Sequence, residues 1–98
     1  MIVHIVMFKF KEENRESNIK KVKQELNGLV SKIDELNSIE VGVDFNRSER
    51  AFDLSLYSTF DSREALNAYA IHEEHLKVVS LIKEVTLESK VVDYKIAE

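Results

Sequence analysis

Apolar positions near the start of the chain follow a strand pattern. Residues 2–10 are rich in β-branched and aromatic types and predict a β-strand. One face carries His4, Val6, Phe8 and Phe10, and the other carries Val3, Ile5 and Met7. Because both faces are apolar, we expect both sides of the resulting sheet to be covered.

The spacing of apolar residues then changes to three and four between residues 14 and 36, which predicts a long amphipathic helix. Asn14 or Ser17 is expected to cap its start. Gly28 lies inside this segment, at a cost of about 1 kcal/mol relative to alanine. Close packing against the sheet is the expected compensation.

Two short segments of period two follow the helix. The first alternates Ile39, Val41, Val43 and Phe45 with polar residues, and the second alternates Phe52, Leu54, Leu56 and Phe60 with polar residues. Each pattern predicts a strand with one buried face. The polar residues 46–50 between them predict an antiparallel hairpin.

The last part of the chain predicts helices and a final strand. Residues 61–64 resemble a helix-capping arrangement, and the helical pattern runs to about residue 85 with a kink at residues 71–75. A strand from about residue 87 to 96 places Val92, Tyr94 and Ile96 on one face, with Val91, Asp93 and Lys95 on the other.

The order of these elements predicts an α+β fold of ferredoxin-like βαββαβ topology, with helices on one face of a four-stranded antiparallel sheet. Residues 1–98 are expected to form a single domain. No helix remains to cover the second sheet face. We therefore expect a homodimer that buries this face against a second copy.

Composition narrows the functional classes. The chain has no cysteine, which excludes disulfides and thiol catalysis. Its net charge of −4 argues against nucleic-acid binding. The sequence has no leader segment and no run of about 20 apolar residues, so a cytoplasmic protein without membrane contact is expected. With only two glycines, a glycine-rich phosphate loop is also excluded, and no cofactor is expected.

Three side chains are the candidates for chemistry: His4, Tyr69 and His75. Histidine can act as acid or base near neutrality, and His4 would approach the other two if its strand face packs beneath the helices. The alternative is a neutral core histidine beside a core aromatic residue. His72 and His75 are three apart, whereas the zinc-protease motif needs four, so no metal site is expected. A helix start with His72 near the N-cap accounts for the same residues.

The chain resembles the stress-responsive dimeric A/B barrel (Dabb) family. The segments that carry the resemblance are residues 3–11, 38–42, 52–54, 68–78 and 91–94. It implies a ferredoxin-like protomer that dimerises through its sheet and has a cleft between sheet and helices. In a plant cyclase of the family, which closes a polyketide by aldol chemistry, the acid/base pair matches Tyr69 and His75. That enzyme's strand-one histidine matches His4.

Two positions depart from the family pattern. Leu54 stands where the cyclase has a further pocket histidine, and Glu73 stands where many members have proline. Three functions follow as hypotheses. The first is cofactor-independent acid/base chemistry on a small apolar or aromatic molecule, with His75 as base and Tyr69 as donor. The others are a non-catalytic dimeric ligand-binding or structural stress module, and a cofactor-independent monooxygenase.

Overall fold

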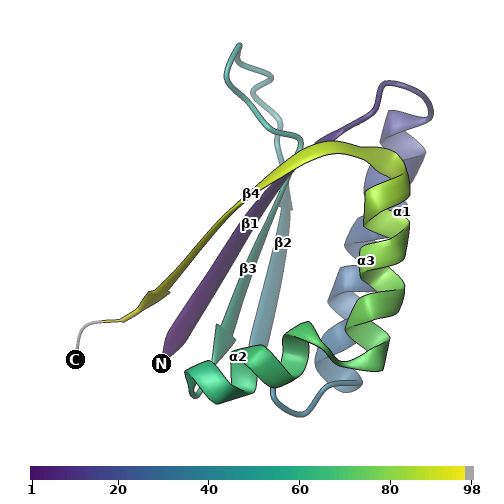
Figure 1. Cartoon of the computed structure of the whole chain (residues 1–98). Helices are drawn as coiled ribbons and strands as arrows, with labels where there is room; N and C mark the ends of the chain where they lie inside the picture. The colour runs from purple at the N-terminus through teal and green to yellow at the C-terminus, as the bar shows by residue number, and fades with distance from the viewer. Residues whose placement is uncertain (97–98) are drawn as a thin grey trace.

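The computed structural model describes residues 1–96 as a sheet with helices packed on one side (Figure 1). The elements are β1 (Ile2–Phe10), α1 (Arg15–Asn27), the 3₁₀ helix η1 (Gly28–Ser31), β2 (Ser38–Val43), β3 (Leu54–Phe60), α2 (Arg63–Ala70), α3 (Glu73–Val85) and β4 (Thr86–Lys95). The strands form one antiparallel sheet in the order β2-β3-β1-β4. The predicted ferredoxin-like βαββαβ fold is confirmed.

The hydrophobic core lies between the sheet and the helices. Phe10 and Phe60 from the sheet and Leu26 from α1 are almost inaccessible to solvent. Val6 and Phe8 belong to the same cluster, so the face of β1 that also carries His4 faces the helices as predicted. None of the helices in this described part of the chain has the length and apolar character needed to span a bilayer.

The first predicted helix is interrupted. α1 ends at Asn27, and Gly28 begins the short helix η1. The expectation that Gly28 packs closely is wrong, because no atom lies within 4 Å of where its Cβ would be. Asn14 occupies the N-cap position with a left-handed φ of 54°, but its side chain makes no capping hydrogen bond. Ser17 instead donates to the carbonyl of Asn14.

The hairpin between β2 and β3 is longer than predicted. β2 ends at Val43, and the chain then leaves the sheet in a loop that extends beyond the strands (Figure 1). Phe45 therefore does not join a buried face and is 93% exposed. Asp53 is buried, and its carboxylate accepts hydrogen bonds from the Phe10 amide at 2.7 Å and from Arg47 Nη2 at 2.7 Å. These contacts hold the loop against the end of β1.

The sheet face away from the helices is apolar and only partly covered. Val3 is fully buried within the single chain, between its cross-strand neighbours Thr59 and Tyr94. The other apolar residues of this outer face are half-buried or exposed: Ile5, Met7, Tyr57, Val92 and Tyr94. The outer face thus keeps an apolar surface that the protomer itself does not cover.

Candidate functional site

Three elements bring the predicted site residues together. His4 comes from β1, Tyr69 from α2 and His75 from α3. The ring centroids of Tyr69 and His75 are 4.2 Å apart, and those of His4 and Tyr69 are 6.3 Å apart. Phe60 also packs against Tyr69, with ring centroids 5.0 Å apart. The structure therefore brings the tyrosine ring into contact with both imidazoles.

The break between α2 and α3 brings His75 to this position. α2 ends at Ala70, and His72 caps α3 because its Nδ1 accepts a hydrogen bond from the Glu74 amide at 3.1 Å. One turn into α3, His75 Nδ1 donates to the Ala70 carbonyl at 3.0 Å. His72 is thus a capping residue, as the sequence alternative predicted. Within residues 1–96 no group of three acidic or histidine side chains is arranged to hold a metal ion.

The hydrogen bond to Ala70 also fixes which nitrogen of His75 can react. A carbonyl oxygen only accepts, so Nδ1 carries the proton and Nε2 of the neutral ring keeps its lone pair. Burial lowers the pKa of His75, and the nearby His4 and His72 lower it further, against the opposing effect of the Ala70 bond. The neutral form, which can accept a proton at Nε2, therefore predominates near pH 7.

Tyr69 is suited to be a proton donor, whereas His75 is suited to be a proton acceptor. Its side chain is 1% exposed, and burial raises its pKa to about 12. The phenol is therefore protonated at neutral pH and has a proton to donate. Among the described residues its buried hydroxyl has no hydrogen-bond partner. An unsatisfied buried hydroxyl costs stability, and an oxygen atom of a bound ligand would relieve that cost.

Asp93 is a member of this cluster that the sequence analysis did not identify. His4 Nδ1 donates to the Asp93 carboxylate, so the other ring nitrogen of His4 is left for a second partner. The two residues are direct cross-strand neighbours of β1 and β4. The period-two pattern had placed Asp93 on one face of the last strand without saying which face points to the helices, and the register between the strands was needed to pair it with His4.

A groove of about 430 Å³ between α2 and β4 leads to this cluster. Its lining residues are Ile2, Arg63, Leu66, Asn67, Asp93, Tyr94 and Lys95. Asp93 thus contacts His4 with its carboxylate and also lines the groove. His4, Tyr69 and His75 do not line the groove themselves, and Asp93 is the residue that connects the groove to this cluster.

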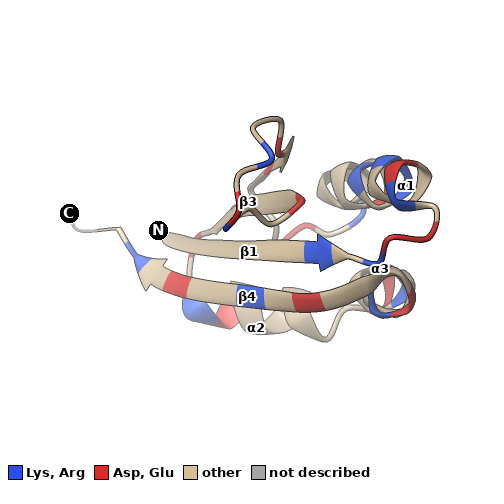
Figure 2. Ribbon diagram, turned by 90° about the horizontal axis from the view of Figure 1, so that it is seen from above, with Lys and Arg blue, Asp and Glu red and all other residues tan. Residues whose placement is uncertain are grey.

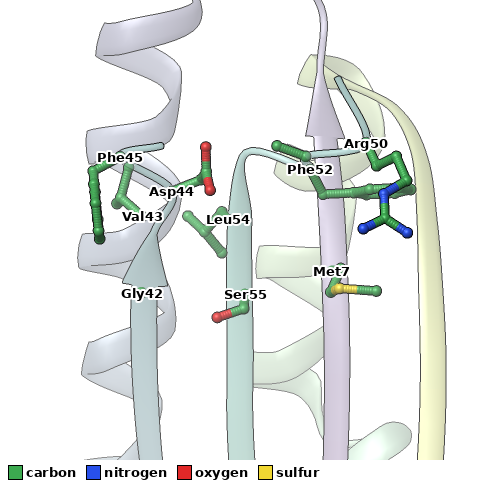
Figure 3. Close-up of a pocket in the computed structure, with 10 residues that line it drawn as sticks. Met7, Gly42, Val43, Asp44, Phe45, Arg50, Phe52, Leu54 and Ser55 are labelled. Carbon is green, nitrogen blue, oxygen red and sulfur yellow. The ribbon is translucent and has the colours of Figure 1, made fainter. Parts of the chain in front are cut away.

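A second hollow of about 450 Å³ lies at the other end of the sheet, beside the β2–β3 loop (Figure 3). Met7 and Ser55 form its floor on the outer face, and Phe45 and Phe52 stand at its sides. Arg50 is its basic residue. Its lining contains neither histidine nor tyrosine, whereas the first groove is connected to the histidine and tyrosine cluster through Asp93.

Comparison with known proteins identifies the family. Residues 2–96 match the sequence profile described as the stress responsive A/B barrel domain, Dabb. This chain belongs to the Dabb family. The family match therefore covers nearly all of the residues that the structure describes.

Individual Dabb-like proteins support this assignment. The stress-response A/B barrel domain-containing protein DABB1 of Arabidopsis thaliana is 28% identical over 103 residues, covering 96% of this chain and 46% of the relative. The chain thus spans about half the length of that relative. A dimeric Bacteroides fragilis protein of ferredoxin-like fold is 30% identical, with a TM-score of 0.89, over 97% of this chain and 95% of the other.

A third similar protein is an enzyme. The hydroxynitrile lyase of Passiflora edulis is 21% identical, with a TM-score of 0.87, and the match covers 99% of this chain and 94% of the enzyme. At that level of identity the likeness concerns the fold alone. Any catalytic activity of this chain must therefore be argued from its own side chains.

Proposed function

We propose that this Dabb domain is a cofactor-independent acid/base catalyst of the cyclase-like kind, acting on a small apolar or aromatic carbonyl compound. The observation that carries the proposal is the contact between His75 and Tyr69, with ring centroids 4.2 Å apart. Environment gives the two side chains opposite roles, because His75 is a neutral base and Tyr69 a protonated donor.

The proposed reaction begins with proton transfer. Nε2 of His75 takes a proton from the carbon next to a substrate carbonyl, and the C–H electron pair becomes the enolate. Tyr69 donates a hydrogen bond to the developing enolate oxygen, whose charge it stabilises. The enolate carbon can then attack a second carbonyl of the same molecule and form a C–C bond. His75 returns its proton to the new alkoxide oxygen, so the sequence is balanced without an oxidant.

His4 and Asp93 complete the proposed site. The Asp93 carboxylate fixes the His4 tautomer with the proton on Nδ1, which leaves Nε2 as the nitrogen available to a ligand. The apolar walls of the groove, Ile2 and Leu66, suit an apolar substrate body. We assign His4 the role of orienting the carbonyl group.

The proposal includes a homodimer formed through the outer sheet face. Its support is the exposed apolar surface of Met7, Tyr57 and Val92 and the dimeric state of the Bacteroides fragilis relative. Burying a contiguous apolar sheet face is favourable in proportion to the area removed from water. The hollow beside Phe45 adjoins this face and would lie at the rim of such an interface.

The proposal is tested by following exchange of the α-hydrogens of aromatic ketones and 1,3-diketones for deuterium in D₂O by NMR. The His75→Ala variant should exchange at least about a hundredfold more slowly than the unaltered protein, and Tyr69→Phe should also be slowed. Lys77→Gln is the matched control, because Lys77 is an exposed residue of the same helix α3 whose side chain pairs with Glu74. Equal exchange rates in the unaltered protein and His75→Ala would contradict the proposal.

One observation favours a second candidate, a non-catalytic binding or structural module. Tyr69 is 1% exposed and enclosed by His4, Phe60 and His75, an arrangement that a packed core also produces. Ligand binding without any deuterium exchange would favour this candidate. The monooxygenase hypothesis stays a separate prediction, and oxygen uptake with a quinol would be its signature.

A further inference from the structure

The groove between α2 and β4 carries a charge pattern that the acid/base chemistry does not use. Arg63 and Lys95 both line it, one from the first turn of α2 and the other from the last residue of β4. Figure 2 shows Lys or Arg, in blue, at the end of β4 and at one end of α2. Within residues 1–96 neither side chain has an acidic partner at ion-pairing distance, although ion pairs form elsewhere on the surface.

The helix side of the groove combines this charge with apolar and amide surface. Arg63, Leu66 and Asn67 are separated by three and four residues and therefore lie on one face of α2. On the strand side, Ile2 and Lys95 are cross-strand partners of β1 and β4. The groove thus has two cations and an amide around an apolar wall, a composition suited to an anionic group attached to an apolar body.

The nearby acidic residues determine at which end of the groove an anion would bind. Asp93 lines its inner part and is engaged by His4. Arg63 and Lys95 also line an adjoining hollow together with Asp61 and Glu64, and Asp61 there accepts a hydrogen bond from the Asn37 amide group at 2.6 Å. An anion is repelled by Asp93 and attracted by Arg63 and Lys95, so it would lie at the outer end.

We infer that the groove binds small apolar or aromatic carboxylates, with the carboxylate between Arg63 and Lys95 and the apolar body extending past Leu66 toward Asp93 and His4. This inference rests on the proposed function, because it names the class of molecule that the same site receives. It also sets the substrate's orientation, since the charged end stays outside and the reacting carbonyl end enters first.

The test compares 4-phenylbutyrate with its neutral amide, 4-phenylbutanamide, by NMR chemical-shift titration of the intact chain at low salt. We expect the carboxylate to shift the amide signals of groove residues and to bind at least about fivefold more tightly than the amide. Arg63→Gln and Lys95→Gln should each weaken carboxylate binding about fivefold and leave the amide's affinity unchanged. Lys83→Gln, an exposed charge on α3 outside the groove, is the control.

Three outcomes would overturn the inference: equal affinity for acid and amide, no response to the two groove substitutions, or shifts confined to residues outside the groove. The His75→Ala variant separates this inference from the proposed function. That variant should bind 4-phenylbutyrate with unchanged affinity although its exchange activity is lost. Carboxylate binding without catalysis would refute the proposed reaction and leave the binding inference standing.

Discussion

Burial keeps both His75 and Tyr69 uncharged near neutral pH. The lowered pKa of His75 means that the unfolded chain takes up a proton more readily than the folded one as the pH falls below about 6.5. Stability contributed by neutral His75 is therefore present above that range and is lost on acidification. The raised pKa of Tyr69 acts at the alkaline end, so the pair is uncharged across the neutral range.

The Tyr69 shift gives a prediction at the scale of one residue. Its pKa rises from 10 to about 12 on folding, so the unfolded state loses its phenolic proton first. The contribution of Tyr69 to stability should be constant below about pH 10 and then decline as the pH rises toward 12. Absorbance titration of tyrosinate should show one ionisation near pH 12 that is absent in Tyr69→Phe. A Tyr69→Phe titration indistinguishable from that of the unaltered protein would refute this assignment.

The sequence was enough to predict His4, Tyr69 and His75 as site residues, but not Asp93. Periodicity placed His4 on the helix-facing side of its strand, and the family resemblance joined it to the other two. The pairing with Asp93 depends on the register of β1 against β4, which local patterning does not determine because the strands are far apart in sequence. The unpaired Tyr69 hydroxyl likewise became evident only with its surroundings.

At the scale of elements, the strand pairs and the break at the histidines could be predicted, whereas two interruptions could not. The apolar spacing through residues 14–36 continues across Gly28, but the backbone tightens there into η1. The alternation that included Phe45 also continues beyond the point where β2 ends. In both cases the apolar pattern continues past the end of the regular hydrogen bonding. Gly28, the C-cap of α1, is a residue type typical of helix ends, but the apolar spacing on both sides of it favoured one continuous helix.

The anchoring of the β2–β3 loop gives a prediction at this scale. Asp53 is buried and accepts from the Phe10 amide and Arg47, so Asp53→Ala leaves a buried donor unpaired. We expect it to lower the free energy of unfolding by about 2 kcal/mol, the cost of a buried amide left without a partner. Asp44→Ala, which removes a more exposed partner of the same arginine, should cost at most about 1 kcal/mol.

Urea denaturation with linear extrapolation measures both values. The comparison separates the buried hydrogen bond from the ion pair, because both aspartates contact Arg47 and only Asp53 accepts from Phe10. Equal losses for the two variants would mean that the contact with the end of β1 adds nothing.

For the whole molecule, the outer sheet face predicts the state of assembly. Ile5→Lys places a charge in the middle of that face and should convert a dimer to a monomer, because a buried lysine without a partner is costly. Val30→Lys alters an exposed apolar residue of η1 on the helical side and should leave the dimer intact. Light scattering at micromolar concentration gives the mass, and a monomeric unaltered protein would contradict the proposed dimer.

β4 presents two different surfaces on alternate residues. Val92 and Tyr94 belong to the outer face, with Tyr94 also at the edge of the groove, whereas Asp93 and Lys95 line the groove from the other face of the strand. Inserting a single residue after Val91 would exchange these sets, turning the carboxylate and the ammonium outward and two apolar side chains inward. Homologues that vary the length of this strand are therefore constrained to change it by two residues at a time, or to absorb the extra residue in a bulge.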